Sequence, residues 1–242
     1  MAACASPGGG GREAYEVVVS AGAYDRQATP TSFELPAPLS GRDLQLRAED
    51  GTIHPVQVAG EGVGYFILDR LAADAEVTLR LEVAPEKGEP EVAALDQAGA
   101  VAFEVDGRPV LRYNSEITDP PREEIDPVYA RGGYIHPIRS PAGVLVSGDY
   151  PPDHLHHHGI WGSWTRTLFQ GEQVDFWNVA DRQGDVLPVA MDSTWSGRVF
   201  GGFTARHRYV ALTADQPREA LRETWTAKEY SVTGGSRPYW LF

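Results

Sequence analysis

The sequence has one cysteine, no long apolar run and few basic residues, and each shortage excludes a class of protein. Among 242 residues only Cys4 carries a thiol, so no disulfide can form within the chain. No apolar stretch approaches the ~20 residues that a membrane-spanning helix needs. With 21 basic and 34 acidic residues, the net charge of −13 repels nucleic acid and anionic membrane surfaces. We therefore expect a small-molecule or glycan ligand, no nucleic-acid partner and no transmembrane segment.

Amphipathic helical patterns are also missing. No window of a dozen residues combines a 3.6-residue apolar repeat with capping residues at both ends. The 26 glycines and 18 prolines instead separate many short β-rich runs. The sequence therefore predicts an all-β protein.

Three parts are expected along the chain. The first β-rich runs have the spacing of a small Ig-like β-sandwich, and the charged, proline-bracketed segment 85–90 has the composition of a linker. These runs are 15–20, 44–48, 64–68 and 77–83. The predicted division is a flexible tether at 1–14, a β-sandwich module at 15–88, and a larger antiparallel β-sandwich, mutarotase-like or jelly-roll-like, at 91–242.

The position of Cys4 allows two interpretations of the N-terminus. Small residues precede it, and Ala5-Ser6-Pro7 and four glycines follow. This pattern resembles the end of a bacterial lipoprotein signal, which would place a lipid-anchored protein outside the cytoplasm. The charged and apolar parts of a signal peptide are absent. An ordinary disordered N-terminal segment of a soluble cytoplasmic protein is the alternative.

Turn and breaker residues organise the larger domain. Asp106-Gly107 joins two β-runs and supplies the positive φ angles of a tight hairpin turn. The proline-rich stretch 119–127 predicts a long surface loop, because proline cannot donate to a central ladder. Further strands are expected at 134–138, 144–147, 203–212 and 221–230.

Four of the seven histidines lie within five positions, in the stretch 153–161. On an extended strand, His154, His156 and His158 would share one face and His157 would point to the other. Burying four imidazoles without a purpose would cost stability, so we interpret the cluster as functional. Imidazole serves both as a metal ligand and as a general acid or base, and the spacing alone does not choose.

Three motifs in order carry a family resemblance. They are Gly133-Tyr134-Ile135-His136-Pro137 with Ser140-Pro141-Ala142-Gly143, then Asp153-His154-Leu155-His156-His157 with Gly159-Ile160-Trp161, then Val174-Asp175-Phe176-Trp177. Over about 101–242 the chain resembles a bacterial family of unknown function often labelled "methane oxygenase PmoA". The resemblance implies a carbohydrate context, an arginine where this chain has His158, and a domain that continues past Phe242. It does not imply a membrane enzyme, because no spanning segment is present.

The candidate site gathers histidines, aromatics and a carboxylate from the second domain. Inclusion of His157 requires a bulge or an extended loop, which Pro151-Pro152 favours. The predicted catalytic residues are His136, His154, His156, His157 and Asp175; the predicted substrate-binding residues are Trp161, Trp177, Arg131 and Glu223; and His154 and His156 are the candidate metal ligands.

Three functions remain open for this site. The first is a carbohydrate-active enzyme that uses a histidine as general acid and a carboxylate as general base. The second is a cupin-like metal enzyme with a divalent transition metal on His154, His156 and His136 plus Asp175 or Glu223. The third is a non-catalytic glycan-binding protein that uses the same aromatics.

Two other histidines receive structural interpretations. His207 lies on the apolar face of an alternating run, where a buried, hydrogen-bonded role is expected. His54 precedes Pro55 without polar neighbours and is expected in an exposed loop.

Overall fold

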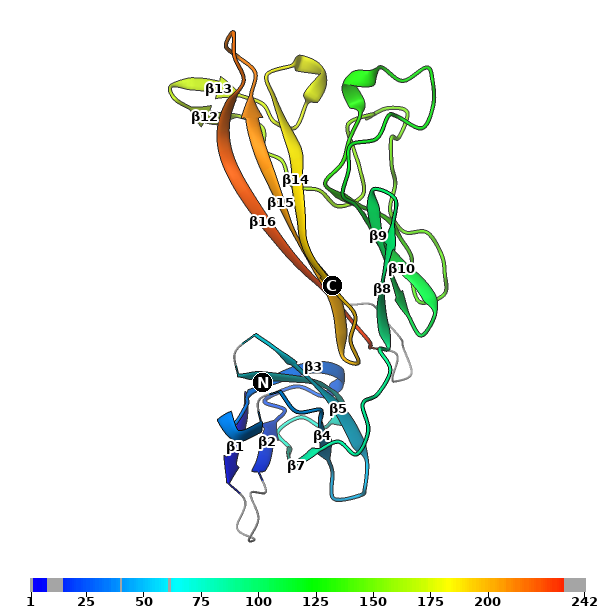
Figure 1. The fold of residues 1–242 in the computed structure, drawn as a ribbon, viewed down its shortest axis with the longest axis vertical. Helices are drawn as coiled ribbons and strands as arrows, with labels where there is room; N and C mark the ends of the chain where they lie inside the picture. The colour runs from blue at the N-terminus through cyan, green and yellow to red at the C-terminus, as the bar shows by residue number, and fades with distance from the viewer. Residues whose placement is uncertain (1, 8–14, 40, 61, 233–242) are drawn as a thin grey trace. The chain divides into compact units, whose positions relative to one another are not determined.

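The computed structural model describes residues 2–7, 15–39, 41–60 and 62–232 and confirms the all-β prediction. Antiparallel strands dominate (Figure 1). The helical segments among these residues are three single 3₁₀ turns, and no helix in this part of the chain could cross a membrane. The turns are η1 (Ala37–Leu39), η2 (Pro127–Tyr129) and η3 (Val179–Asp181).

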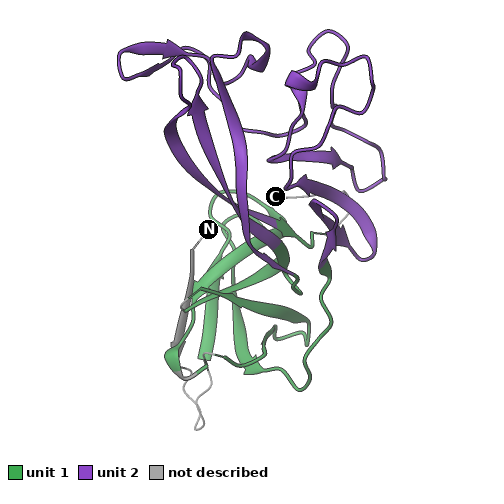
Figure 2. Cartoon of the chain, turned by 45° about the horizontal axis from the view of Figure 1, so that its top comes forward, with its two compact units in different colours: residues 1–92, 196–201, 229–242 green, residues 93–195, 202–228 purple. Residues whose placement is uncertain are grey.

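The described residues form two compact units (Figure 2). Unit 1 contains the chain up to Val92, then Ser196–Gly201 and the residues from Glu229 onward. Unit 2 contains Ala93–Trp195 and Gly202–Lys228. The sequence-based division places everything from residue 91 in one domain, whereas two later segments belong to the first unit.

Unit 1 is built on one seven-stranded antiparallel sheet with the order β1-β2-β7-β4-β5-β6-β3. The sheet bends back at β5, because residues 53–56 pair with β4 and residues 57–59 pair with β6. The two edge strands, β1 and β3, approach each other. The strands are β1 (Ala2–Pro7), β2 (Tyr15–Ser20), β3 (Arg26–Glu34), β4 (Leu44–Arg47), β5 (Ile53–Ala59), β6 (Val63–Leu71) and β7 (Glu76–Val83).

Period-2 alternation directs the core of unit 1. In β2, Val17 and Val19 are fully buried and Val18 between them is exposed, as side chains on opposite faces of a strand require. Phe33 and Phe66 meet edge to face in the same core, with ring centroids 6.2 Å apart. Burial of these apolar side chains supplies the main driving force for folding this unit.

Several expectations for unit 1 need correction. His54 lies on the buried face of β5, 6% exposed and 5.9 Å from the ring of Phe66, and not in an exposed loop. The sequence pattern also missed β3, which contains a proline, and the whole of β5. Residues 2–7 of the predicted tether pair with β2, and residues 8–14 lie outside the described residues.

Gln57 ties the late segment of unit 1 to the early sheet. Its side-chain oxygen accepts hydrogen bonds from the amides of Val199 (3.0 Å) and Phe200 (3.1 Å), and its nitrogen donates to the Phe200 carbonyl (2.8 Å). The ring of Tyr65 packs on that of Phe200. One side chain therefore satisfies three backbone groups more than 140 residues away in sequence.

Unit 2 contains three antiparallel sheets. One has the order β11-β10-β9-β8, one is the hairpin β12-β13, and one is β14-β15-β16. The strands are β8 (Val92–Gln97), β9 (Ala100–Val105), β10 (Arg108–Asn114), β11 (Tyr134–Ile138), β12 (Thr167–Phe169), β13 (Glu172–Val174), β14 (Gly184–Trp195), β15 (Phe200–Ala211) and β16 (Arg218–Tyr230).

The four-stranded and three-stranded sheets of unit 2 share a core. The ring of Tyr113 on β10 stacks on that of Phe203 on β15, with centroids 4.3 Å apart, and Phe103 on β9 lies 6.0 Å from the same ring. A second cluster joins the β12-β13 end to β14 and β15 and includes Phe176 and Tyr209. The sandwich-like packing of this unit follows from these contacts.

The turn chemistry predicted for unit 2 is confirmed at the hairpin of β9 and β10. Asp106 and Gly107 both have positive φ, at 50° and 69°, which a two-residue turn of this kind requires. The stretch 119–127 is a loop, as expected. The strand expected at 144–147 does not form: this segment makes a single bridge, between Leu145 and Arg139.

The carboxyl group of Glu229 gives the first testable prediction. It is 2% exposed, and neither oxygen has a hydrogen-bond partner among the described residues. Burial raises its pKa from 4.5 to about 8. Between these values the unfolded chain releases the proton and the folded chain keeps it, so stability should fall as pH rises from 4.5 to 8.

Glu229→Gln should remove that loss, which amounts to about 4 kcal/mol at pH 8. Urea unfolding of both proteins at pH 4.5 and pH 8 measures it. A stability difference that is the same at both pH values would contradict a buried, protonated carboxyl group.

Candidate functional site

The histidine loop, residues 150–159, consists of turns and not of a regular strand, in agreement with the bulge or loop that the inclusion of His157 requires. The His154 amide bonds the Pro151 carbonyl (3.0 Å), and the His157 amide bonds the His154 carbonyl (2.9 Å), so two turns follow one another. Pro151-Pro152 cannot supply ladder donors, which explains why the chain turns here. A turn brings residues three apart together, so His154 and His157 lie on one side instead of on opposite faces.

Backbone pairing holds the base of this loop. The Tyr150 amide bonds the His157 carbonyl, and the Gly159 amide bonds that of Gly148. Ile160 then pairs with Ile135 of β11 through bonds of 2.8 and 3.0 Å. At Gly159, which has φ 39°, a Cβ would collide with the Ile135 carbonyl oxygen. Glycine at this position therefore permits the loop to approach β11.

Three imidazoles meet on this loop. The rings of His154 and His157 stack 4.8 Å apart with planes 14° from parallel, and His156 meets His157 edge to face at 4.5 Å. Both His156 and His157 also contact Trp177, at 6.4 and 5.6 Å. We call His154, His156, His157, Trp161 and Trp177 the histidine–tryptophan face.

A stacked series of flat groups lies behind these imidazoles. The rings of Trp161 and Trp177 stack at 5.0 Å, and the guanidinium of Arg131 lies 4.5 Å from the Trp161 ring centre. Arg131 and Trp177 thus both contact Trp161. Cation–π attraction to Arg131 fixes the inner end of the series.

Arg131 is a buried ion and not a surface ligand-binding residue. It is 3% exposed, and its Nη1 donates to the Asp185 carboxylate and to the Val186 carbonyl, both at 2.8 Å. Burial raises the pKa of Asp185, and the positive charge of Arg131 opposes that shift. Arg131 lies between η2 and β11, and Asp185 lies on β14. Their ion pair holds the guanidinium against the ring of Trp161.

His158 belongs to a second buried layer. Its Nδ1 lies 2.8 Å from Asp149, which also accepts a bond from the Tyr134 hydroxyl. Burial lowers the pKa of His158, and Asp149 opposes that shift. Asp149 was not among the residues predicted from the sequence. The signal that could have identified it is its position next to Tyr150 and four residues before the histidine stretch.

Asp175 positions the backbone that carries Trp177. Its carboxylate accepts bonds from the amides of Trp177 (2.8 Å) and Asn178 (2.9 Å) and from the Asn178 side chain (2.7 Å). Partial burial alone would raise the pKa of Asp175, but these bonds hold it below its ordinary value. A weakly basic, fully bonded carboxylate suits a positioning role better than that of a general base.

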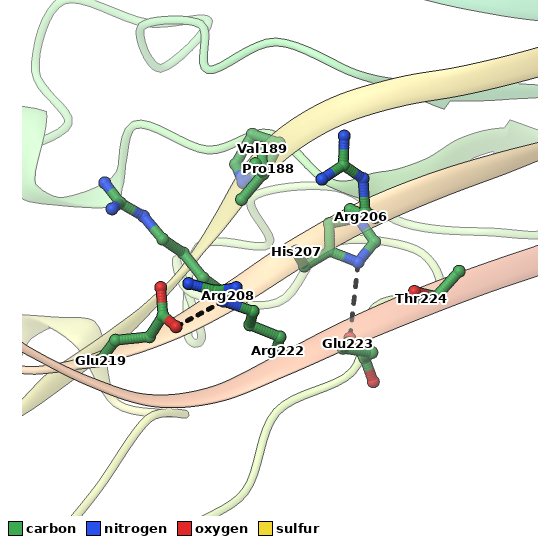
Figure 3. Close-up of a pocket in the computed structure, with 9 residues that line it drawn as sticks. All are labelled: Pro188, Val189, Arg206, His207, Arg208, Glu219, Arg222, Glu223 and Thr224. Carbon is green, nitrogen blue, oxygen red and sulfur yellow. Dashed lines mark hydrogen bonds and ion pairs between the residues drawn. The ribbon is translucent and has the colours of Figure 1, made fainter.

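Two further predicted site residues lie apart from the three imidazoles. The Nδ1 of His136 lies 2.8 Å from the Ser147 hydroxyl, and among the described residues no ring contact joins His136 to the face. Glu223 lies 3.4 Å from Nδ1 of His207 and lines a separate hollow (Figure 3). His207 itself is 2% exposed and bonds the Tyr113 hydroxyl, so its expected buried, hydrogen-bonded environment is confirmed.

The proposed metal donors do not converge. Among residues 2–7, 15–39, 41–60 and 62–232, no group of three or more His, Cys, Asp and Glu side chains is placed to hold one ion. His136, Asp175 and Glu223 each have the other partners described above. The cupin-like set therefore does not fit this arrangement.

Comparison with known proteins matches residues 100–242 to one family model. The chain belongs to DUF6807, a family of unknown function. The DUF6807 region contains the whole histidine–tryptophan face and also His207 and Glu223. Nothing in the match links this family to the label "methane oxygenase PmoA". No curated protein and no solved structure matches the chain.

The buried pair beneath the face gives the second prediction. Asp185→Asn leaves the Arg131 charge unpaired, which should cost about 3 kcal/mol of unfolding free energy. The exposed pair Arg206–Asp192 is a matched control, and Asp192→Asn should cost less than ~1 kcal/mol. Urea unfolding monitored by tryptophan fluorescence measures both variants. Equally small losses of unfolding free energy in the two variants would show that the buried Arg131 charge does not need Asp185 as its partner.

Proposed function

We propose that the histidine–tryptophan face handles a sugar or sugar-derived ligand. The observation that carries this proposal is the Trp161–Trp177 stack with imidazoles at its edge. An aromatic ring offers a flat apolar surface to sugar C–H groups, and adjacent polar groups bond the hydroxyls.

Trp177 is the residue most suited to contact the ligand. Arg131, His158 and Trp177 all contact Trp161, which is thereby enclosed. The ring contacts of Trp177 among the described residues are with Trp161 and with the imidazoles of the face itself. Asp175 fixes the backbone at Trp177, so little rotational freedom is lost on binding. The acidic protein also favours a neutral glycan over a polyanion at this surface.

His156 is the strongest candidate for acid–base work. Burial lowers its pKa, and the neighbouring His157, His154 and His158 lower it further. The imidazole is therefore neutral at pH 7 and can accept a proton from a sugar hydroxyl or a carbon acid. In this proposal His156 is the base, and the adjacent His154 and His157 bond the ligand or return the proton.

Non-catalytic glycan binding is the second candidate, and the contacts of Asp175 favour it. The carboxylate proposed as a catalytic partner is engaged by three hydrogen bonds that shape the loop. A binding protein needs the aromatic stack and the imidazole donors but no free carboxylate.

The role of the tryptophan stack is tested by Trp177→Ala. Affinity for neutral mono- and disaccharides should fall at least tenfold, since a stacked aromatic contact of about 1.5 kcal/mol is lost. Trp164→Ala is the control, because Trp164 is 58% exposed and lies outside the stack. Titration calorimetry against a panel of neutral sugars measures both. An unchanged affinity in Trp177→Ala would refute the proposed surface.

The acid–base role is tested by pH. If neutral His156 is the base and its pKa lies below 6.5, turnover should be level above pH 6.5 and fall as pH drops further. His156→Ala should abolish turnover while retaining most sugar affinity. If the unmodified protein binds sugars but does not convert them, the enzymatic function is excluded and non-catalytic glycan binding is supported. Turnover that persists in His156→Ala would assign the base elsewhere.

A further inference from the structure

A serine–histidine pair lies at β11 in unit 2, apart from the histidine–tryptophan face. Oγ of Ser147 is 2.8 Å from Nδ1 of His136, a distance at which an imidazole can activate a nucleophile. His136 lies on β11, and the segment that ends at Ser147 folds back along this strand, where the Val146 amide donates to the Ile138 carbonyl. Both Ser147 and His136 are half-buried, so a small reagent can reach them.

The hydrogen bonds of Ser147 favour one direction for its proton. The Ile138 amide donates to the same Oγ at 2.9 Å, which leaves the hydroxyl hydrogen to donate to Nδ1 of His136. Burial lowers the pKa of His136, so the imidazole is neutral at pH 7 and can accept that hydrogen. The Ile138 amide also stabilises negative charge on Oγ, because a donor favours the ionised form. Ser147 is therefore poised to act as a nucleophile.

Asp149 supplies negative charge near this base. It raises the pKa of His136 against the effect of burial, whereas Arg139 lowers it. A nearby carboxylate stabilises the imidazolium that forms when the serine hydrogen is transferred. Because Asp149 is bonded to His158 and Tyr134, it acts on His136 through space and not through a direct bond.

The backbone after Ser147 offers donors for a developing oxyanion. Gly148 is exposed, and a Cβ at this position would meet nothing within 4 Å. The amides of Gly148 and Asp149 donate to no carbonyl among the described residues. In hydrolases with an exposed serine, the amide that follows the nucleophile is one of the two donors of the oxyanion hole. Gly148 holds that position here.

An exposed apolar surface adjoins the serine. The three apolar residues 144–146 are between 49% and 62% exposed, and Ile160 is 43% exposed. Ile160 pairs with Ile135, the residue before His136. Contiguous exposed apolar side chains indicate a surface that binds an apolar group. An acyl chain on this surface would have its carbonyl carbon near Ser147.

We propose that Ser147 and His136 form an esterase site for esters of small apolar carboxylic acids. Oγ of Ser147 attacks the ester carbonyl, and its hydrogen passes to Nδ1 of His136. The bond to the alcohol oxygen then breaks, and the alcohol leaves with that hydrogen. Water attacks the acyl-serine, gives a hydrogen to His136 and releases the carboxylic acid, after which the hydrogen returns to Oγ. One ester and one water are consumed, and the proposal does not rest on the function of the histidine–tryptophan face.

Covalent labelling tests the nucleophile in the unmodified chain. A fluorophosphonate should modify Ser147, which mass spectrometry of tryptic peptides locates. The same reagent should abolish hydrolysis of p-nitrophenyl butyrate, apart from the slow background that exposed imidazoles give. The rate that the reagent abolishes should be several times higher for p-nitrophenyl butyrate than for p-nitrophenyl acetate, because the longer chain covers more of the apolar surface.

Three variants identify the groups involved. Ser147→Ala should remove both the label and the reagent-sensitive rate, and His136→Gln should lower that rate at least ~100-fold because the base is lost. Ser140→Ala is the matched control and should keep both. Oγ of Ser140 also accepts an amide in this hairpin, from Val144 at 3.2 Å, but has no imidazole partner among the described residues.

The labelling result needs no variant, so it decides the matter even where a substitution prevents folding. The proposal is overturned if the fluorophosphonate does not modify Ser147, or if the reagent-sensitive rate survives in Ser147→Ala or His136→Gln. A butyrate rate no higher than the acetate rate would also overturn it, since the apolar surface would then not bind the acyl chain.

Discussion

The candidate site depends on a buried cation. A guanidinium removed from water needs a counter-ion, and Arg131 has one in Asp185; its Nη1 also donates to the Val186 carbonyl, while its Nη2 is buried without a partner among the described residues. Its flat face then supports Trp161, and Trp161 supports Trp177. The orientation of Trp177 thus depends, through Trp161, on the ion pair that holds Arg131 in place. Neighbouring Asp149 and His158 form a similar polar layer under the histidine loop.

Loop conformation converts a sequence cluster into a surface. As an extended strand, the stretch would have divided its imidazoles between two faces. Consecutive turns bring three of them together, and the fourth, His158, is buried against Tyr134, Tyr150 and Trp161. Adjacent histidines thereby have different environments: burial and like charges lower the pKa of His156, while an acid partner orients His158. Such differences allow neighbouring residues of one type to have separate roles.

Local chemistry made much of the fold predictable. The alternation in β2 and the Asp106-Gly107 turn specify their own geometry, and the all-β class follows from them. β5 was missed because its halves pair with different neighbours, which only the assembled sheet determines. For the site, the residue types and the link between the imidazoles and Trp177 were predictable. The burial of Arg131, the partner of Glu223 and the contribution of Asp149 were not, because contacts between distant strands decide them.

Unit 1 is built from segments that are far apart in the sequence, and this affects how the protein folds during synthesis. The first 92 residues leave the ribosome early, but the side chain of Gln57 meets its backbone partners only after Val199 and Phe200 have been made. Pairing across such a separation carries a large loop-closure cost and slows folding. The early sheet must therefore persist with part of its surface uncovered while unit 2 is translated. Nascent chains halted before residue 196 should be the species most in need of chaperones.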